Sequence, residues 1–305
     1  MKRNKEIVEQ VLTQTQRLVL GKEKQVKLAL AAFLADTHIL IEDLPGVGKT
    51  TLAKTLSYVL GLEYSRIQFT SDLLPSDILG VNFYNTKDGT FNFKKGPVFT
   101  QFLLADEINR ASSKTQSALL EAMEEKQVSI DGVEYQLPTP FFVIATKNPS
   151  EEVGTYELPS SQLDRFALVF SLGYPSYEAE RAILQHKNQI SLKELTPLKS
   201  EEIAGLKKSH EDVYVEESII DLIQDILLFT RESGLFQNGL SPRAALILLG
   251  ISKAWASIAL RDFVIPSDLL DILPYVIHHR LEPIKSQMTH QEIVDAITKN
   301  LTIDT

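Results

Sequence analysis

A glycine-rich turn carries the residues of this sequence with the clearest chemistry. Residues 38–51 read H-I-L-I-E-D-L-P-G-V-G-K-T-T, an apolar run that leads into a turn and then a helix. Backbone N–H groups in such a turn converge on an anion, and the helix adds its positive end. Polyphosphate fits, because Lys49 would reach the β- and γ-phosphates and the Thr50 hydroxyl would bind Mg²⁺. The predicted phosphate-binding residues are Pro45, Gly46, Val47, Gly48, Lys49, Thr50 and Thr51.

The loop departs from the usual pattern at one position. G-x-x-x-x-G-K-[ST] places a glycine five residues before Gly48, where this chain has Asp43. The N–H groups expected to surround the phosphates come after Asp43, so the substitution leaves them in place. A glycine-containing strand-to-helix turn without a ligand is the competing interpretation. A second motif is needed to separate the two.

Two adjacent carboxylates supply that second motif. Residues 101–107 read Q-F-L-L-A-D-E, so Asp106 and Glu107 would lie at the carboxyl end of a buried strand. Asp106 could hold the hydration shell of Mg²⁺ beside Thr50, and Glu107 could polarise a water molecule aligned with the γ-phosphate. Asp-Glu after a buried strand is also common at helix starts. The phosphate loop upstream favours the catalytic interpretation.

Three further polar residues could complete a site for phosphoryl transfer. Asn148 follows the apolar run 141–146, and its amide could hydrogen-bond the γ-phosphate or the attacking water. Arg165 could supply positive charge from a neighbouring subunit as an arginine finger, and Arg243 could meet the same phosphate from a second domain. Asn-Pro also favours turns, and single arginines also form surface salt bridges. Both interpretations stay open at this point.

The elements that must position these residues alternate between strand and helix. Strands are predicted at residues 38–41, 64–69, 102–105, 141–146 and 166–171, and helices at 51–60, 113–125 and 158–163. Such alternation predicts βαβ units and an α/β fold with a parallel five-stranded sheet between helical layers. Ligands of such sheets bind at the carboxyl ends of the strands, where the phosphate loop would lie.

Two segments with period-two alternation interrupt this pattern. Residues 81–93 and 128–135 each contain a turn with glycine between apolar-polar alternations, so we predict two β-hairpins inserted into the core. Ordinary edge hairpins and partner-contacting hairpins are equally compatible with the periodicity.

The chain changes character after residue 175. No further strand pattern follows, and helices are predicted at residues 177–189, 200–209, 217–230, 242–260, 266–276 and 290–300. We therefore predict two domains, a nucleotide-binding core over residues 1–175 and an all-helical domain over residues 176–305.

Composition restricts the remaining possibilities. The chain has 305 residues, 44% apolar content and no cysteine, which excludes disulfides and thiol nucleophiles. A net charge of −9 and a pI near 5.3 argue against general nucleic-acid binding. The sequence shows no apolar run long enough to span a bilayer, and its first residues predict an amphipathic helix, not a signal peptide. We expect a cytoplasmic protein without membrane insertion.

The ordered motifs resemble the MoxR family of AAA+ ATPases. They read L-P-G-V-G-K-T-T, F-L-L-A-D-E-I-N-R-A, V-I-A-T-K-N-P, L-P-S-S-Q-L-D-R-F and G-L-S-P-R-A. Loops of this family carry either glycine or aspartate at the position of Asp43. The resemblance implies ATP and Mg²⁺ as cofactors and a P-loop AAA+ core with a C-terminal helical lid.

By this resemblance, the site residues take the roles of the family motifs. They are Lys49 and Thr50 in Walker A, Asp106 and Glu107 in Walker B, Asn148 as sensor 1, Arg165 as trans-acting finger, Arg243 as sensor 2, and Val19, Leu20 and Gly21 at the adenine. Arg110 is also typical of the family. The family further implies a homo-oligomer, a hexameric ring, that acts as a chaperone-like remodelling or assembly factor on protein clients, including partners with a von Willebrand A domain.

Other functions remain compatible with these residues. Within AAA+ proteins, the alternatives are the ATPase subunit of a metal chelatase and a helicase-like motor, the latter disfavoured by the acidic charge. From another class, the chain could be a nucleotide-gated binding module with little turnover, which intact Glu107 and Asn148 disfavour. A small-molecule kinase is also disfavoured, because it would not need the long helical lid or the pair Arg165 and Arg243.

Overall fold

A parallel five-stranded sheet forms the centre of the molecule. The computed structural model describes residues 2–87, 89–148, 155–185, 190–284 and 288–301. The sheet contains β1 (Ile39–Glu42), β2 (Tyr64–Gln68), β5 (Phe102–Asp106), β8 (Phe142–Lys147) and β9 (Leu168–Phe170). Their order is β2-β5-β8-β1-β9, and every neighbouring pair is parallel. The predicted parallel five-stranded sheet is confirmed.

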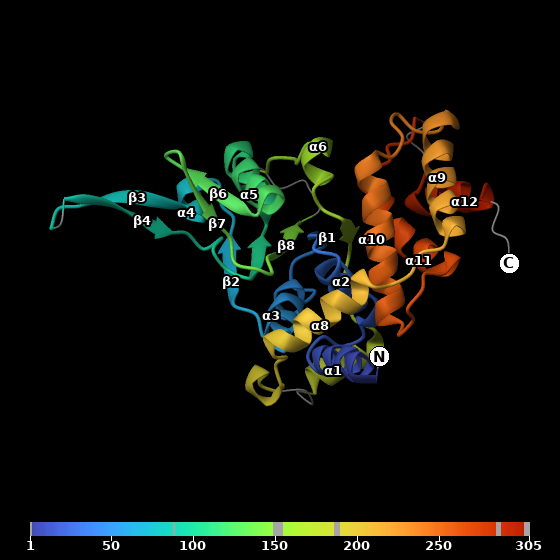
Figure 1. Cartoon of the computed structure of the whole chain (residues 1–305), viewed down its shortest axis with the longest axis horizontal. Coiled ribbons are helices and arrows are strands. Elements are labelled where there is room, and N and C mark those ends of the chain that lie inside the picture. The colour runs from blue at the N-terminus through green and yellow to red at the C-terminus, as the bar shows by residue number, and fades with distance from the viewer. Residues whose placement is uncertain (1, 88, 149–154, 186–189, 285–287, 302–305) are drawn as a thin grey trace.

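Alternate residues of the strands face two separate apolar layers. On one face, Ile39 and Ile41 of β1 belong to the cluster that also contains residues of the N-terminal helices and of α3. On the other face, Leu40 packs in a second cluster with residues of α5. Because successive side chains of a strand point to opposite faces, strands that are apolar throughout fit a sheet covered on both sides. This produces a three-layered αβα core (Figure 1).

The helices of this core include two that sequence analysis did not predict, Glu23–Leu34 and Pro75–Leu79. They are α1 (Lys2–Gln16), α2 (Glu23–Leu34), α3 (Lys49–Val59), α4 (Pro75–Leu79), α5 (Ser113–Glu125) and α6 (Ser160–Leu163), with a 3₁₀ turn at Ile108–Arg110. The predicted helices at 51–60, 113–125 and 158–163 correspond to α3, α5 and α6. Helix α2 was not predicted, because its last seven residues are all buried and show no polar stripe.

Helices alone follow the sheet. They are α7 (Tyr177–Leu184), α8 (Ser200–Glu211), α9 (Glu217–Glu232), α10 (Pro242–Ile258), α11 (Pro266–Ile277) and α12 (His290–Lys299), with a 3₁₀ turn at Leu192–Glu194. Helices α9 to α12 gather on one side of the molecule as a lid (Figure 1), whereas α8 packs against α1, α2 and α10. Predicted and observed bounds agree within two residues except at α7, where residues 186–189 lie outside the described ranges. Within the described ranges, no helix combines the length and the apolar character that crossing a membrane requires.

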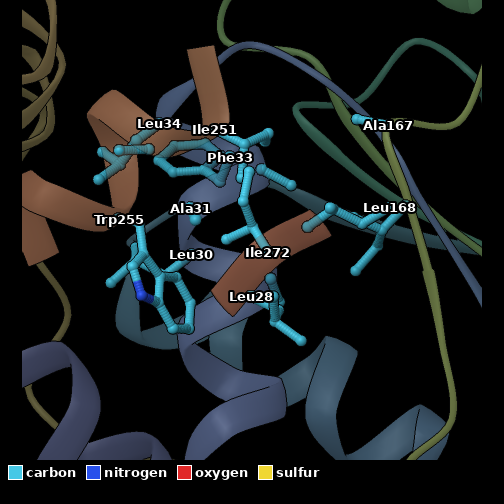
Figure 2. Packing of buried hydrophobic residues seen from close by; sticks show 14 of the residues in the cluster. Leu28, Leu30, Ala31, Phe33, Leu34, Ala167, Leu168, Ile251, Trp255 and Ile272 are labelled. Atoms are coloured by element: carbon cyan, nitrogen blue, oxygen red, sulfur yellow. The ribbon is translucent and has the colours of Figure 1, made fainter. Parts of the chain in front are cut away.

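The apolar core runs from the sheet into the lid without interruption. Phe33 of α2 packs edge-on against Phe142 of β8, with ring centroids 5.7 Å apart. The same cluster contains Ile251 and Trp255 of α10 and Ile272 of α11, which surround α2 (Figure 2). The core therefore continues across the predicted boundary at residues 175 and 176, which itself stays a prediction.

The two predicted hairpins are present. β3 (Gly80–Asn85) pairs with β4 (Thr90–Lys95), and β6 (Gln127–Ile130) pairs with β7 (Val133–Gln136), both antiparallel. The β3–β4 hairpin extends away from the molecule (Figure 1) and exposes Phe91. At its base, the Phe93 ring stacks on Tyr135 of β7 with centroids 4.1 Å apart, which joins the two hairpins.

The base of the β3–β4 hairpin is tightly packed. A Cβ atom on Gly80 would lie 2.3 Å from the Lys94 carbonyl oxygen, and one on Gly96 would lie 2.2 Å from that of Ile78. Backbone atoms cannot yield to such contacts, so the base of this hairpin requires glycine at both positions.

Phe33→Ala should lower the free energy of unfolding by about 3–5 kcal/mol, because it leaves a cavity where α2, the sheet and the lid meet. Chemical denaturation measures this change. Phe91→Ala is the matched control: this side chain is 74% exposed, and its loss should change stability by about 1 kcal/mol or less. Equal losses in the two variants would contradict the shared core.

Candidate active site

The phosphate loop connects β1 to α3 at the carboxyl edge of the sheet. Gly46 and Gly48 have φ angles of +85° and +100°, in the left-handed region that glycine favours. A Cβ on either residue would meet nothing within 4 Å, so backbone conformation and not space requires glycine here. Gly48 is the N-cap of α3, and Lys49 is its first residue. The free N–H groups of the first helical turn thus lie at the loop, as an anion site requires.

Lys49 is buried, and it forms hydrogen bonds with residues that follow two neighbouring strands, β1 and β8. Its ammonium group donates to the Asp43 carbonyl oxygen at 2.6 Å and to Asn148 Oδ1 at 2.9 Å. Asn148 Nδ2 in turn donates to Glu107 Oε1 at 3.2 Å. Burial lowers the pKa of Lys49, and the negative charges of Asp43, Asp106 and Glu107 oppose that shift. The structure therefore connects three of the predicted site residues in one chain of hydrogen bonds.

Asp106 is held by two residues that sequence analysis missed. Thr146 Oγ1 donates to Asp106 Oδ1 at 2.6 Å and accepts from the Glu107 N–H at 2.8 Å. Arg66 of β2 donates to Asp106 Oδ2 through Nη2 at 2.7 Å and Nε at 3.2 Å. Thr146 could have been found from its position at the end of a buried strand beside Asn148. Arg66 has no local signal, because only the pairing of β2 with β5 brings it to Asp106.

Glu107 has an unusual backbone conformation. Its φ and ψ are 57° and 51°, the left-handed region that non-glycine residues rarely adopt and that is enriched at functional sites. Besides Asn148, its carboxylate accepts from Arg110 Nη1 at 3.1 Å. Arg110 is half exposed, so this ion pair contributes about 1 kcal/mol or less. The two partners fix the direction of the Glu107 carboxylate.

The residues predicted to bind Mg²⁺ have suitable chemistry. Mg²⁺ prefers oxygen ligands and is usually held by one or two carboxylates, retained waters and substrate phosphates. The Asp106 carboxylate can accept further contacts, because each oxygen has two lone pairs and each accepts from one residue, Thr146 or Arg66. The Thr50 hydroxyl, in the first turn of α3, would provide the second protein oxygen.

Arg165 and Arg243 lie together at the opposite edge of the sheet. Both form ion pairs with Glu124 of α5, Arg243 through Nη1 at 3.0 Å. They line one cavity with His38, which precedes β1, whereas the phosphate loop follows β1. At about 3.3 Å per residue, the two edges are roughly 15 Å apart along β1. The structure thus brings the arginines to each other and not to the loop of their own chain.

The segment predicted to bind adenine lies against the start of α7. Gly21 has a φ of +66°, and a Cβ there would lie 3.4 Å from Ala179 Cβ. Val19 is buried. Its role, and that of Leu20, at the adenine stays a prediction. Pro149 of the predicted V-I-A-T-K-N-P motif lies outside the described residues.

Comparisons with known proteins agree with this fold. The model of the ATPase family associated with various cellular activities (AAA) matches residues 38–168, and that of the AAA lid domain matches residues 228–297. A crystal structure of a Cytophaga hutchinsonii protein assigned as an ATPase aligns with a TM-score of 0.91 and 33% identity, covering 99% of this chain and 96% of that one. Fold and site therefore define a AAA+ protein.

Sequence relatives identify the family to which the chain belongs within the AAA+ proteins. The chain is 37% identical to Chaperone MoxR1 of Mycobacterium tuberculosis, over 97% of this chain and 80% of that protein. It is 43% identical to Uncharacterized protein YeaC of Bacillus subtilis, over 92% and 91%. The chain belongs to the MoxR family of AAA+ ATPases.

Thr146→Val should lower the free energy of unfolding by about 1–3 kcal/mol, because the buried Asp106 carboxylate and the Glu107 N–H both lose a partner. Urea denaturation measures the effect. Thr13→Val is the matched control, since Thr13 is exposed on α1 and its replacement should change stability by about 0.5 kcal/mol or less. A loss no larger than that of the control would contradict the role of Thr146.

Proposed function

We propose that this chain hydrolyses ATP to ADP and phosphate with Mg²⁺ and acts as a chaperone-like remodelling or assembly factor on protein clients. The main support for this proposal is the chain of hydrogen bonds that runs from Lys49 through Asn148 to Glu107 beside the phosphate loop. It places a cation, an amide and a carboxylate around one position. Groups of these kinds can stabilise the phosphate charge, orient the attacking water and accept its proton in phosphoryl transfer.

Each residue has a distinct task in this proposal. Lys49 exchanges the Asp43 carbonyl for the β- and γ-phosphates and neutralises part of their charge. Asn148 orients the γ-phosphate or the attacking water, and Glu107 accepts a proton from that water. Thr50 and Asp106 hold Mg²⁺, which supplies further neutralisation of phosphate charge when it is bound.

The position of Arg165 and Arg243 supports assembly into a ring. Each is separated from the phosphate loop of its own chain by the length of β1, so a second copy must present them to an ATP molecule. A head-to-tail contact between copies closes into a ring when its rotation permits. We propose a hexamer by analogy with AAA+ proteins.

Partner and location follow from the family and the composition. Chaperone MoxR1 is named a chaperone, which supports protein clients, and we extend this to partners with a von Willebrand A domain by the resemblance of the motifs. The net charge of −9 disfavours a DNA motor. A cytoplasmic location stays a prediction. A Glu107→Gln protein that retains ATP would hold its client for identification by co-purification.

Glu107→Gln should lower ATP turnover by about 10²–10⁴-fold and leave ATP affinity within a few-fold, because it removes the proton acceptor and keeps the shape of the side chain. Steady-state phosphate release and binding of a fluorescent ATP analogue measure the two effects. Glu125→Gln, an exposed residue of α5, is the control. If turnover equals that of the unmodified protein while ATP still switches partner binding, the chain is a nucleotide-gated binding module instead.

Arg165→Ala should retain ATP binding and lose turnover by about 10³–10⁵-fold, the contribution of an arginine finger. Mixing it with a Lys49→Ala protein, which is inactive alone, should restore activity to about one quarter at equal amounts, since random mixing pairs an intact loop with an intact finger at that fraction of interfaces.

Two results would exclude a finger acting between copies. One is an absence of recovery in rings shown by native mass spectrometry to contain both variants. The other is undiminished hydrolysis by dilute, monomeric Arg165→Ala protein.

A further inference from the structure

We propose that Asp43, which stands where the usual loop has glycine, couples nucleotide binding to the linker between β9 and α7. The linker is defined here as residues 171–176, between β9 and α7. The inference rests on the proposed binding of ATP at Lys49 and adds a residue that positions a second segment of the chain.

Asp43 bonds to four segments at once. Its side chain is buried, with Oδ1 accepting from the Leu44 N–H at 2.8 Å and Oδ2 accepting from the Gly173 N–H at 2.6 Å. Its own N–H donates to the Lys147 carbonyl at 3.1 Å. Its carbonyl accepts from Lys49 at 2.6 Å. One residue therefore contacts the loop, the end of β8, the phosphate-binding lysine and the linker.

The contact with the linker needs the side chain. Glycine at this position would keep both main-chain bonds and lose both carboxylate bonds, so the loop would no longer reach Gly173. Hydrogen bonds from N–H groups to a carboxylate are stronger than those to a neutral acceptor. Gly173 has a φ of +66°, and this turn presents its N–H to Asp43 where few other residues could adopt the same backbone.

The linker is also held from the segment before α2. Lys22 Nζ donates to the Tyr174 carbonyl at 2.6 Å, and Gln25 Nε2 donates to that of Ser171 at 3.4 Å. These contacts do not involve the phosphate loop. Asp43 is the residue through which the loop itself acts on the linker.

Nucleotide binding should tighten this contact. Residues 44–46 are exposed, and opening of the loop would carry Asp43 away from Gly173. Phosphates bound to the loop N–H groups disfavour such opening. Because the Gly173 N–H is released only when Asp43 leaves it, the amide should exchange more slowly when nucleotide is bound.

Hydrogen exchange with mass spectrometry tests this coupling, using the full chain and a non-hydrolysable ATP analogue with Mg²⁺. In the unmodified protein, the analogue should slow exchange in peptides that cover residues 44–52 and in those that cover the linker, the latter by about tenfold when the analogue is present at about ten times its Kd. In Asp43→Gly, slowing of the loop should remain and slowing of the linker should disappear.

Two further variants keep the test decisive. Asp43→Asn preserves shape but can accept through only one atom, so it should also lose most of the slowing in the linker even if Asp43→Gly folds poorly. Asp221→Asn, an exposed residue of α9, removes the same charge elsewhere and should behave as the unmodified protein.

The outcomes separate the coupling from the proposed function. Linker protection that persists in Asp43→Gly and Asp43→Asn would overturn the coupling while leaving ATP binding intact. Failure of the analogue to protect residues 44–52 in the unmodified protein would instead overturn nucleotide binding at this loop.

Discussion

The pairing of β8 between β5 and β1 is the constraint on which the site depends. Parallel pairing puts the carboxyl ends of all three strands at one edge, and the central position of β8 places Asn148 between Glu107 and Lys49. An order that separated β8 from β5 or from β1 would move this amide away from Glu107 or from Lys49. The buried, apolar strands thus determine the spacing of polar groups that lie just beyond them.

Sequence patterns predicted the parts of this arrangement that are local. The phosphate loop and the Asp106–Glu107 pair follow apolar runs, so their position at the edge of the sheet could be inferred. The contacts of Arg66 with Asp106 and of Arg165 and Arg243 with Glu124 could not, because tertiary pairing alone brings them together. Helix α2 escaped prediction for the related reason that complete burial removes the polar stripe by which helices are recognised.

The continuous core limits how the lid can move. Phe33 packs against both the sheet and the helices α10 and α11 (Figure 2), so sliding of the lid across α2 would expose apolar surface on both sides. Helix α2 follows directly after Gly21 and Lys22, and Lys22 bonds to the linker. Phe33, which packs against the lid, and Lys22, which bonds to the linker, therefore belong to one short segment of the chain.

The closely packed base of the β3–β4 hairpin connects this projection to the helix that contacts both arginines. Gly80 and Gly96 have no room for a side chain where the hairpin leaves α4, and the stacked rings of Phe93 and Tyr135 join it to the second hairpin. The second hairpin begins at Gln127, two residues after α5 ends, and α5 carries Glu124. We therefore expect a force applied at the exposed hairpin to reach α5, whose Glu124 pairs with Arg165 and Arg243.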